Sequence, residues 1–310
     1  MKGPGIHTPE EKGDGSGTLH VVSTPLGNLE DITLRGIKVL KDVDVIAAES
    51  VQRTKGFCNH YGITTQIVSY NQHNRKRRTP ELMRHLRAGK NLALVTDAGT
   101  PGISDPGINL VDRALKEGIK VSPVPGPSAV SAALSVSGMP AEEFLFLGFL
   151  STKKGKRKSA LKKLIFEPRT TVFFEAPHRL HSLLSDIKVI LGDRQIVLLR
   201  EMTKVFEEIR AGKVSEILEH LEGVEIRGEC TIVVAGNQVE EKPQTLTEEG
   251  KRKIRTLLGT GKMSMKDISQ LLSREEGLPY RQVYKECLIC KRDIEGAREN
   301  GVGKKTENKK

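Results

Sequence analysis

Aromatic residues are scarce in this chain of 310 residues, since they make up 4% of it and tryptophan is absent. A protein that holds nucleic acid mainly by base stacking needs several exposed aromatic rings, so that mode of binding is disfavoured here. Cysteine is also sparse, with four residues, which excludes a disulfide scaffold and fits free thiols in a reducing compartment. Cys287 and Cys290 form a lone Cys-x-x-Cys, and because zinc needs four ligands we interpret them as buried helix cysteines and expect no metal site.

Long apolar runs and the common nucleotide-binding motifs are missing as well. No run approaches the roughly 18 residues of a membrane helix, and the first residues lack the apolar core of a signal peptide. We therefore expect a cytoplasmic protein with no membrane contact. The turn after the first predicted strand contains only Gly27, which excludes the G-x-G-x-x-G dinucleotide fingerprint, and Gly261-Lys262 lacks the earlier glycine of a Walker A loop.

Basic residues, in contrast, are abundant and clustered. The chain has 50 Lys and Arg against 39 Asp and Glu, a formal charge of +11, and such a balance favours a polyanionic partner. Residues 151–169 contain eight basic residues and one acid, and a second cluster occupies residues 75–78. The alternative is solvated surface and a flexible loop. We expect RNA phosphates to contact these side chains: Arg75, Lys76, Arg77, Arg78, Lys153, Lys154, Lys156, Arg157 and Lys158.

Short apolar segments alternate with helical patterns over the first 150 residues, which predicts an α/β fold with a parallel, doubly wound sheet. The expected strands are residues 19–22, 43–47, 67–68, 92–95, 119–124 and 144–147, the last closing the first unit. Asp31 is expected to cap a helix from about Ile32, and Thr79 to cap another. A second α/β unit follows, with strands at 171–174, 195–199 and 231–235.

The pattern after Val239 changes to polar and then helical, with apolar residues at helical spacing around Ile254, Ile268 and Val283. The predicted organisation is thus two α/β domains with a small helical C-terminal appendage. Its boundaries are a disordered tail (1–17), an N-terminal α/β domain (18–150), a C-terminal α/β domain (151–238), the helical appendage (239–297) and a charged tail (298–310).

The richest loop is residues 96–107, with three glycines, two prolines and two aspartates directly after the apolar run Leu92–Val95. At the carboxyl end of a parallel strand, such a loop lies where open α/β sheets bind ligands. A simpler interpretation makes it a tight turn in which Asp105 caps the next helix and Pro106 is the first helical residue. That interpretation leaves residues 97–102 unexplained, so we expect a ligand at this loop.

Several motifs together resemble one known family. They are Thr24-Pro25-Leu26-Gly27-Asn28, Asp97-Ala98-Gly99-Thr100-Pro101, Ser104-Asp105-Pro106-Gly107, Pro125-Gly126-Pro127-Ser128-Ala129, Glu175-x-Pro177-His178-Arg179-Leu180 and Arg200-Glu201-x-Thr203-Lys204. In this combination the chain resembles the ribosomal RNA small subunit methyltransferase I family, from about residue 18 to 236. The resemblance implies the tetrapyrrole-methylase (class III methyltransferase) fold, with S-adenosylmethionine bound between two α/β domains, and a homodimer.

The resemblance also implies an activity and a binding site. The activity is 2′-O-methylation of a cytidine in the decoding region of small-subunit (16S) rRNA, with the assembled 30S subunit as the expected substrate. The implied cofactor-binding residues are Leu26, Gly27, Asp97, Gly99, Thr100, Pro101, Ile103, Ser128, Ala129, Met202 and Thr231. Alternatives are a tetrapyrrole-precursor methylase of the same fold, or a non-catalytic RNA-binding relative. Ser50, Gln52, Asn71 and Arg75 depart from the family's pattern in two loops on the expected substrate side.

Methyl transfer from a sulfonium is an in-line displacement, so most of the task is alignment. A neutral ribose hydroxyl is a poor nucleophile, and a nearby base or cation should assist its deprotonation. The candidates at predicted strand ends of the second unit are Glu175, His178 and Lys204. Each also has a structural alternative, since His178 can cap its helix and Lys204 can pair with Glu201.

Overall fold

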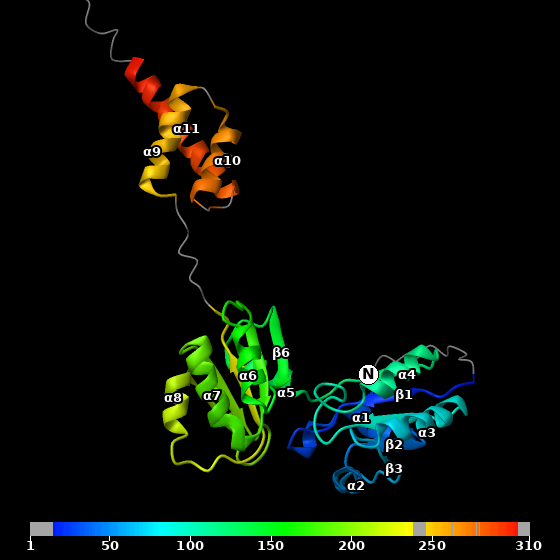
Figure 1. The fold of residues 1–310 in the computed structure, drawn as a ribbon. Helices are drawn as coiled ribbons and strands as arrows, with labels where there is room; N and C mark the ends of the chain where they lie inside the picture. Colours follow the sequence, from blue (N-terminus) through cyan, green and yellow to red (C-terminus); the bar gives the residue numbers. More distant parts are fainter. Residues whose placement is uncertain (1–14, 238–245, 262, 277, 279, 303–310) are drawn as a thin grey trace, which may run out of the picture. The chain divides into compact units, whose positions relative to one another are not determined.

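The computed structural model describes residues 15–237, 246–261, 263–276, 278 and 280–302 (Figure 1). The chain divides into two compact units, Met1–Asn237 and Gln238–Lys310. Most of the predicted N-terminal tail, and residues 303–310 of the charged tail, lie outside the described residues.

The first sheet of the larger unit is entirely parallel and has the strand order β3-β2-β4-β1-β5. Strands β2 and β4 are buried along their whole length, as expected for a parallel sheet covered on both faces. The five carboxyl ends therefore meet at one edge. The elements are β1 (Leu19–Val22), η1 (Leu29–Asp31), α1 (Leu34–Asp42), β2 (Val45–Ala48), α2 (Val51–His60), β3 (Gln66–Ser69), α3 (Arg75–Arg87), β4 (Leu92–Val95), α4 (Ile108–Lys116) and β5 (Val121–Val124).

The first predicted helix start was wrong. Asp31 lies in the short 3₁₀ turn η1, and helix α1 begins two residues after the predicted start at Ile32. Thr33 is its cap, because the Thr33 hydroxyl accepts a 3.0 Å hydrogen bond from the Gly36 N–H.

Helix α3, in contrast, begins earlier than predicted, at Arg75, so that Thr79 and Pro80 lie inside it. An asparagine turn causes this, since the Asn71 carbonyl accepts from the Arg75 N–H at 3.0 Å and starts the helix. The Thr79 hydroxyl bonds to the Tyr70 hydroxyl instead of capping. The basic cluster at residues 75–78 is therefore helical.

The second sheet is mixed and has the order β6-β7-β10-β8-β9. Strand β6 pairs with β7 in parallel, and the remaining pairs are antiparallel. Helices α2 and α8 and the edge strand β9 were not predicted from the sequence. The elements are α5 (Ala129–Ser137), β6 (Phe144–Phe149), α6 (Lys154–Lys162), β7 (Thr170–Glu175), α7 (Pro177–Leu191), β8 (Gln195–Arg200), β9 (Glu208–Lys213), α8 (Val214–His220) and β10 (Cys230–Val234).

The boundary between the two α/β halves differs from the predicted one at residue 150. Strand β6 belongs to the second sheet, and Val130, Ala133 and Leu134 of α5 pack on side chains of β7, β8 and β10. The chain thus crosses from one half to the other after β5, through Pro125-Gly126-Pro127-Ser128. Periodicity predicted a strand near Phe144, but it does not show which sheet a strand joins.

The second unit is a three-helix domain made of α9 (Glu248–Thr260), α10 (Met265–Glu276) and α11 (Tyr280–Val302). Its core contains Ile254, Ile268 and Val283, which confirms the predicted apolar positions. Cys287 and Cys290 are buried free thiols in this core, as predicted. Among the described residues, no helix has the length and apolar character needed to span a membrane.

Candidate active site

A cleft of about 370 Å³ opens where strand ends of the two sheets face each other. One wall comes from the segments after β1, β2 and β4 and from the crossover that follows β5. The other wall comes from the ends of β6, β7 and β8 and the start of β10. Because the carboxyl ends of the parallel strands meet here, the cleft occupies the position where α/β sheets bind ligands.

Most of the predicted cofactor-binding residues lie in this cleft: Leu26, Asp97, Gly99, Thr100, Ile103, Ser128, Ala129, Met202 and Thr231. Gly27 lines a neighbouring pocket of about 210 Å³ instead, and Pro101 is buried in the same loop without lining either pocket. The sequence reasoning missed several lining residues as site candidates: Glu49, Arg53, Ala98, Asp105, Val130, Phe149, Phe174, Ala176, Pro177, Glu229 and Cys230.

Hydrogen bonds between loops fix the wall made by the first sheet. Thr24 and Gly99 exchange backbone N–H···O bonds of 2.9 and 3.0 Å. The Thr100 hydroxyl donates to the Pro127 carbonyl at 3.1 Å and lies 2.9 Å from the Ser23 hydroxyl. Gly99 has φ +74°, a conformation that favours glycine. The loop at residues 96–107 is thus tied both to the β1 loop and to the crossover.

A network of charged and polar groups joins the β2 and β4 loops. Asp97 accepts from the Ser50 N–H at 3.1 Å and forms an ion pair with Arg53 at 3.3 Å. The Asp97 N–H in turn donates to Glu49 at 3.3 Å. Burial raises the pKa of Glu49, and the charge of Asp97 adds to this. The backbone N–H at Ser50 and the Arg53 side chain therefore hold Asp97 in place together.

Asp105 is not the helix cap that the sequence suggested. Helix α4 begins at Ile108, and its N-cap residue, Gly107, makes no side-chain cap. Asp105 lines the cleft, where burial raises its pKa to about 7 and the negative charges of Glu49, Asp97 and Glu229 add to the effect. A carboxyl group in this environment is protonated far more readily than in water.

This pKa predicts a pH-dependent cost in stability. The folded state holds the Asp105 proton more tightly than the unfolded state, so stability falls as pH rises from about 3.8 to about 7. We expect Asp105→Asn to raise the free energy of unfolding at pH 8 by about 1–2 kcal/mol, allowing for solvent screening at this partly exposed site. The gain should vanish near pH 4. Urea unfolding of the ligand-free protein measures it, and Asp112→Asn on the surface of α4 is the control.

Glu175 is the most buried carboxylate of the cleft, with 1% of its surface exposed. Its Oε1 accepts from the Ala176 N–H at 2.9 Å and lies 3.1 Å from Nε of Arg179. Its Oε2 has no hydrogen-bond partner within the described part of the chain. A buried, unpaired carboxylate oxygen is costly. A ligand donor in the cleft would satisfy it.

The other two catalytic candidates do not line the cleft. His178 lies near the start of α7, outside the set of residues that line the cleft. Lys204 forms an ion pair with Glu201 at 2.9 Å, which is the structural alternative considered for it. Its side chain lies against Gly27, where an added Cβ would be 2.1 Å from Cγ of Lys204.

A second contact reinforces this connection between the two halves, since the Asn28 N–H donates to the Thr203 hydroxyl at 3.0 Å. Glu201 and Thr203 both have positive φ, at 49° and 65°. Such conformations are strained for residues other than glycine and cluster at functional sites. Here they flank Met202, which lines the cleft.

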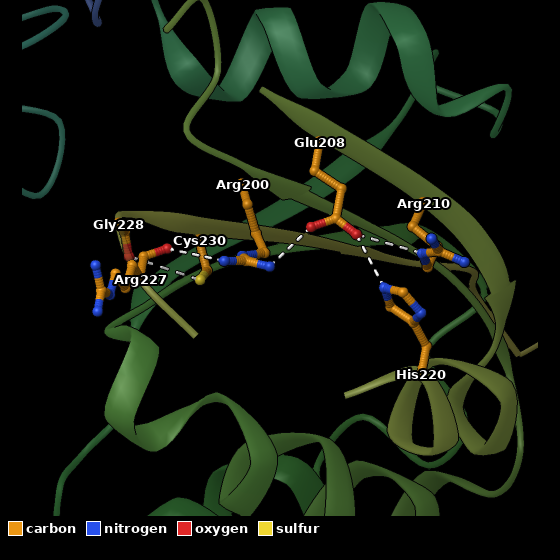
Figure 2. Close-up of polar contacts among 7 residues, drawn as sticks. All are labelled: Arg200, Glu208, Arg210, His220, Arg227, Gly228 and Cys230. Carbon is orange, nitrogen blue, oxygen red and sulfur yellow. Dashed lines mark hydrogen bonds and ion pairs between the residues drawn. The ribbon is translucent and has the colours of Figure 1, made fainter. Parts of the chain in front are cut away.

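An ion-pair network supports the wall made by the second sheet (Figure 2). Glu208 accepts from Arg200 at 2.7 Å, from Arg210 at 3.3 Å and from His220 at 3.1 Å. Burial alone would raise the pKa of Glu208, but these partners hold it below its usual range. Arg200 also donates to the Arg227 carbonyl at 3.2 Å, so the network connects the end of β8 with the segment before Cys230, which lines the cleft.

The basic clusters prove less uniform than the sequence suggested. Arg157 is buried, with 5% exposure, and donates to Asp186 at 2.8 Å and to Ser182 at 2.7 Å. The prediction that Arg157 contacts RNA was therefore wrong, because the guanidinium is part of the core beneath α6. Lys158 lies 3.5 Å from the same Asp186 carboxylate. Lys153, Lys154 and Lys156 are exposed.

The cluster on α3 is divided in the same way. Lys76 and Arg77 are exposed. Arg75 donates to the Asn109 side chain at 2.9 Å, and Arg78 forms an ion pair with Glu81 at 2.7 Å. Of the nine residues predicted to contact RNA, the exposed ones are thus Lys76, Arg77, Lys153, Lys154 and Lys156.

The fold and the cleft define a class of protein. Residues 18–218 match the model of the Tetrapyrrole (Corrin/Porphyrin) Methylases. Among solved structures, the chain resembles uroporphyrin-III C-methyl transferase from Thermus thermophilus complexed with S-adenyl homocysteine. The TM-score is 0.52 at 21% identity, and the match covers 71% of this chain and 97% of that one. At that identity the likeness shows the fold, which is the predicted class III methyltransferase fold.

Curated relatives narrow the class. The chain is 41% identical over 274 residues to ribosomal RNA small subunit methyltransferase I of Halalkalibacterium halodurans, covering 87% of this chain and 94% of the relative. It is 49% identical over 222 residues to the protein of that name from Thermotoga maritima, covering 72% and 100%. The chain belongs to the ribosomal RNA small subunit methyltransferase I family, as the motifs predicted.

Proposed function

We propose that this protein uses S-adenosylmethionine to methylate the 2′-hydroxyl of a cytidine in small-subunit rRNA. The observation that supports this most directly is the cleft itself, which nine predicted cofactor residues from both halves line together with Glu175, whose Oε2 has no hydrogen-bond partner among the described residues. Family membership supports a methyltransferase that acts on rRNA. The cytidine, the 2′-hydroxyl, the 30S subunit as substrate, a homodimer and a cytoplasmic location are parts of the proposal.

The residues present fit the cofactor. Bound S-adenosylmethionine supplies the electrophilic methyl group. Gly99 and Ala129 provide a stretch of wall with little side-chain bulk, so that backbone groups can approach the ligand, and Leu26 adds an apolar surface. Met202 and Thr231 close the opposite wall.

Glu175 would accept the proton of the ribose hydroxyl through Oε2, while Arg179 and the Ala176 N–H hold Oε1. We assign the base to Glu175 and not to His178 or Lys204, because Glu175 is the one of these three residues that lines the cleft. Lys204 would act indirectly, by keeping the residue 201–204 turn against Gly27.

Two measurements test the function. S-adenosylmethionine is titrated into the purified protein by calorimetry, and ribose methylation is mapped on 30S subunits from cells with and without the gene. We expect binding, and one ribose methyl group that disappears with the gene and returns when the protein is added. Binding without any change in methylation would contradict the proposed activity, and methylation of a tetrapyrrole precursor would favour the small-substrate alternative.

The exposed cations give a further prediction. Substitutions that neutralise the five exposed cations should weaken rRNA binding independently of the RNA sequence, because contacts to phosphates position the protein on the RNA but do not read its bases. These residues are Lys76, Arg77, Lys153, Lys154 and Lys156. The slope of log K against log salt should fall by about 0.7–0.9 for each phosphate that a neutralised side chain no longer binds. Filter binding at several salt concentrations measures it. Replacing the exposed Lys38, Lys41 and Lys188 outside both clusters is the control, and an unchanged slope in the cluster variant would contradict the prediction.

A further inference from the structure

The charge of the cleft is opposite to that of the whole chain. Although the formal net charge is +11, five carboxylates line the cleft: Glu49, Asp97, Asp105, Glu175 and Glu229. Arg53 is the single cationic side chain among the described residues that line it. Its side chain is 69% exposed and already paired with Asp97.

The charges around this lining do not cancel the excess. Arg179 lies beside Glu175 at 3.1 Å and balances that one carboxylate. Lys204 is 2.9 Å from Glu201 and reaches Glu229 only at 3.9 Å. The negative charge of the lining therefore exceeds the positive charge near it.

Two independent observations indicate that a ligand carrying positive charge or donor groups occupies the cleft. The first is Oε2 of Glu175, which is unpaired among the described residues in a side chain that is 1% exposed. The second is Asp105, whose neighbours Glu49, Asp97 and Glu229 disfavour a further negative charge. The electrostatic potential that disfavours a negative charge on Asp105 favours a positive charge on a ligand in the same cleft.

We propose that these carboxylates select the cofactor by its charge, binding S-adenosylmethionine, with its sulfonium, more tightly than S-adenosylhomocysteine. This inference rests on the proposed function. In the transfer, the C–S bond breaks and its electron pair stays on sulfur, while a C–O bond forms to the ribose oxygen and the hydroxyl proton passes to Glu175. The cofactor thus loses one positive charge, and its attraction to the carboxylates of Glu49 and Glu229 weakens at the moment when it must leave.

A metal ion is the competing use of such carboxylates. Among the described residues, however, no group of three or more His, Cys, Asp or Glu side chains is placed to hold one.

The acidic lining also separates the binding of RNA phosphates from the binding of the cofactor. RNA phosphates are attracted to the exposed lysines of residues 153–156 and repelled from the cleft, which leaves it to the cofactor and the reacting ribose.

The test compares three ligands by calorimetry on the full-length protein: S-adenosylmethionine, S-adenosylhomocysteine and sinefungin, which has a charged amine group at the sulfonium position. We expect the two cationic ligands to bind at least ten-fold more tightly than S-adenosylhomocysteine. Glu49→Gln and Glu229→Gln should each reduce this ratio about three-fold, whereas Glu142→Gln, on the exposed segment before β6, should leave it unchanged.

Equal affinity for all three ligands, or a ratio that neither glutamine variant changes, would overturn the inference while leaving the proposed function intact. Binding of Mg²⁺ alone that Glu49→Gln abolishes would also overturn it, in favour of a metal site. Failure of all three ligands to bind would instead contradict the proposed function. Thermal unfolding of each variant without ligand shows whether it is folded.

Discussion

Replacing Glu175 with glutamine should lower kcat for rRNA methylation about 10²- to 10⁴-fold, the usual contribution of a general base. Glutamine keeps the shape of the side chain but cannot take the ribose proton through Oε2, the oxygen that is unpaired in the described structure. The loss corresponds to about 3–5 kcal/mol of transition-state stabilisation. Single-turnover methylation of 30S subunits at saturating cofactor measures it.

Separate measurement of kcat and of cofactor affinity distinguishes a base from a merely structural residue. Because glutamine weakens the hold on Arg179, a structural defect should also change cofactor affinity. The expected result is cofactor affinity within a few-fold of wild type, with His178→Gln close to wild type in rate. An unchanged rate in Glu175→Gln would exclude it as the base.

The largest expected effect on stability lies at the buried ion pair beneath α6. Arg157→Ala should lower the free energy of unfolding by about 3–5 kcal/mol, because it removes one partner and leaves the carboxylate of Asp186 buried. The Asp186 side chain is 9% exposed, and Lys158, at 3.5 Å, compensates only in part. Urea unfolding measures the loss. Lys156→Ala, one residue earlier and exposed, should change stability by no more than about 0.5 kcal/mol.

The same pair of variants tests the division of the basic cluster. Lys156→Ala should weaken rRNA binding, and Arg157→Ala, at a temperature where it is folded, should not. The opposite outcome, a stable Arg157→Ala with weakened RNA binding, would return Arg157 to the RNA-contacting residues. Replacing both partners, as Arg157→Met with Asp186→Leu, should recover much of the stability, because neither charge is then left alone.

Local signals predicted much of the fold. The apolar strands β2 and β4 and the core positions of α9, α10 and α11 follow from hydrophobic pattern alone. The hydrophobic pattern did not show which sheet β6 joins, because strand pairing depends on contacts between residues that are distant in sequence. Helix α3 began early because two asparagines form a turn, which outweighed the preference for Thr79 and Pro80 as a start.

The site was predicted from motifs more completely than from physical patterns. Motif resemblance located most of the loops that line the cleft, whereas Asp105 was interpreted as a cap and Phe149 and Phe174 were overlooked. Arg157 carried a usable signal, since Arg157, Leu161 and Leu164 recur at i, i+4 and i+7 and so share the buried face of the segment. The positive φ of Glu201 and Thr203 was not predictable from the sequence pattern, because neither residue is a glycine.

The crossover at Pro125-Gly126-Pro127-Ser128 has a consequence for how the protein is made. Within the larger unit every strand of the first sheet precedes the crossover, and every strand of the second sheet follows it. The ribosome therefore completes the first sheet before it synthesises any strand of the second. Since domains fold as units during synthesis, residues 15–124 can acquire their core while the later residues are still being translated. The cleft can form only after the second half, which supplies its other wall, has been synthesised.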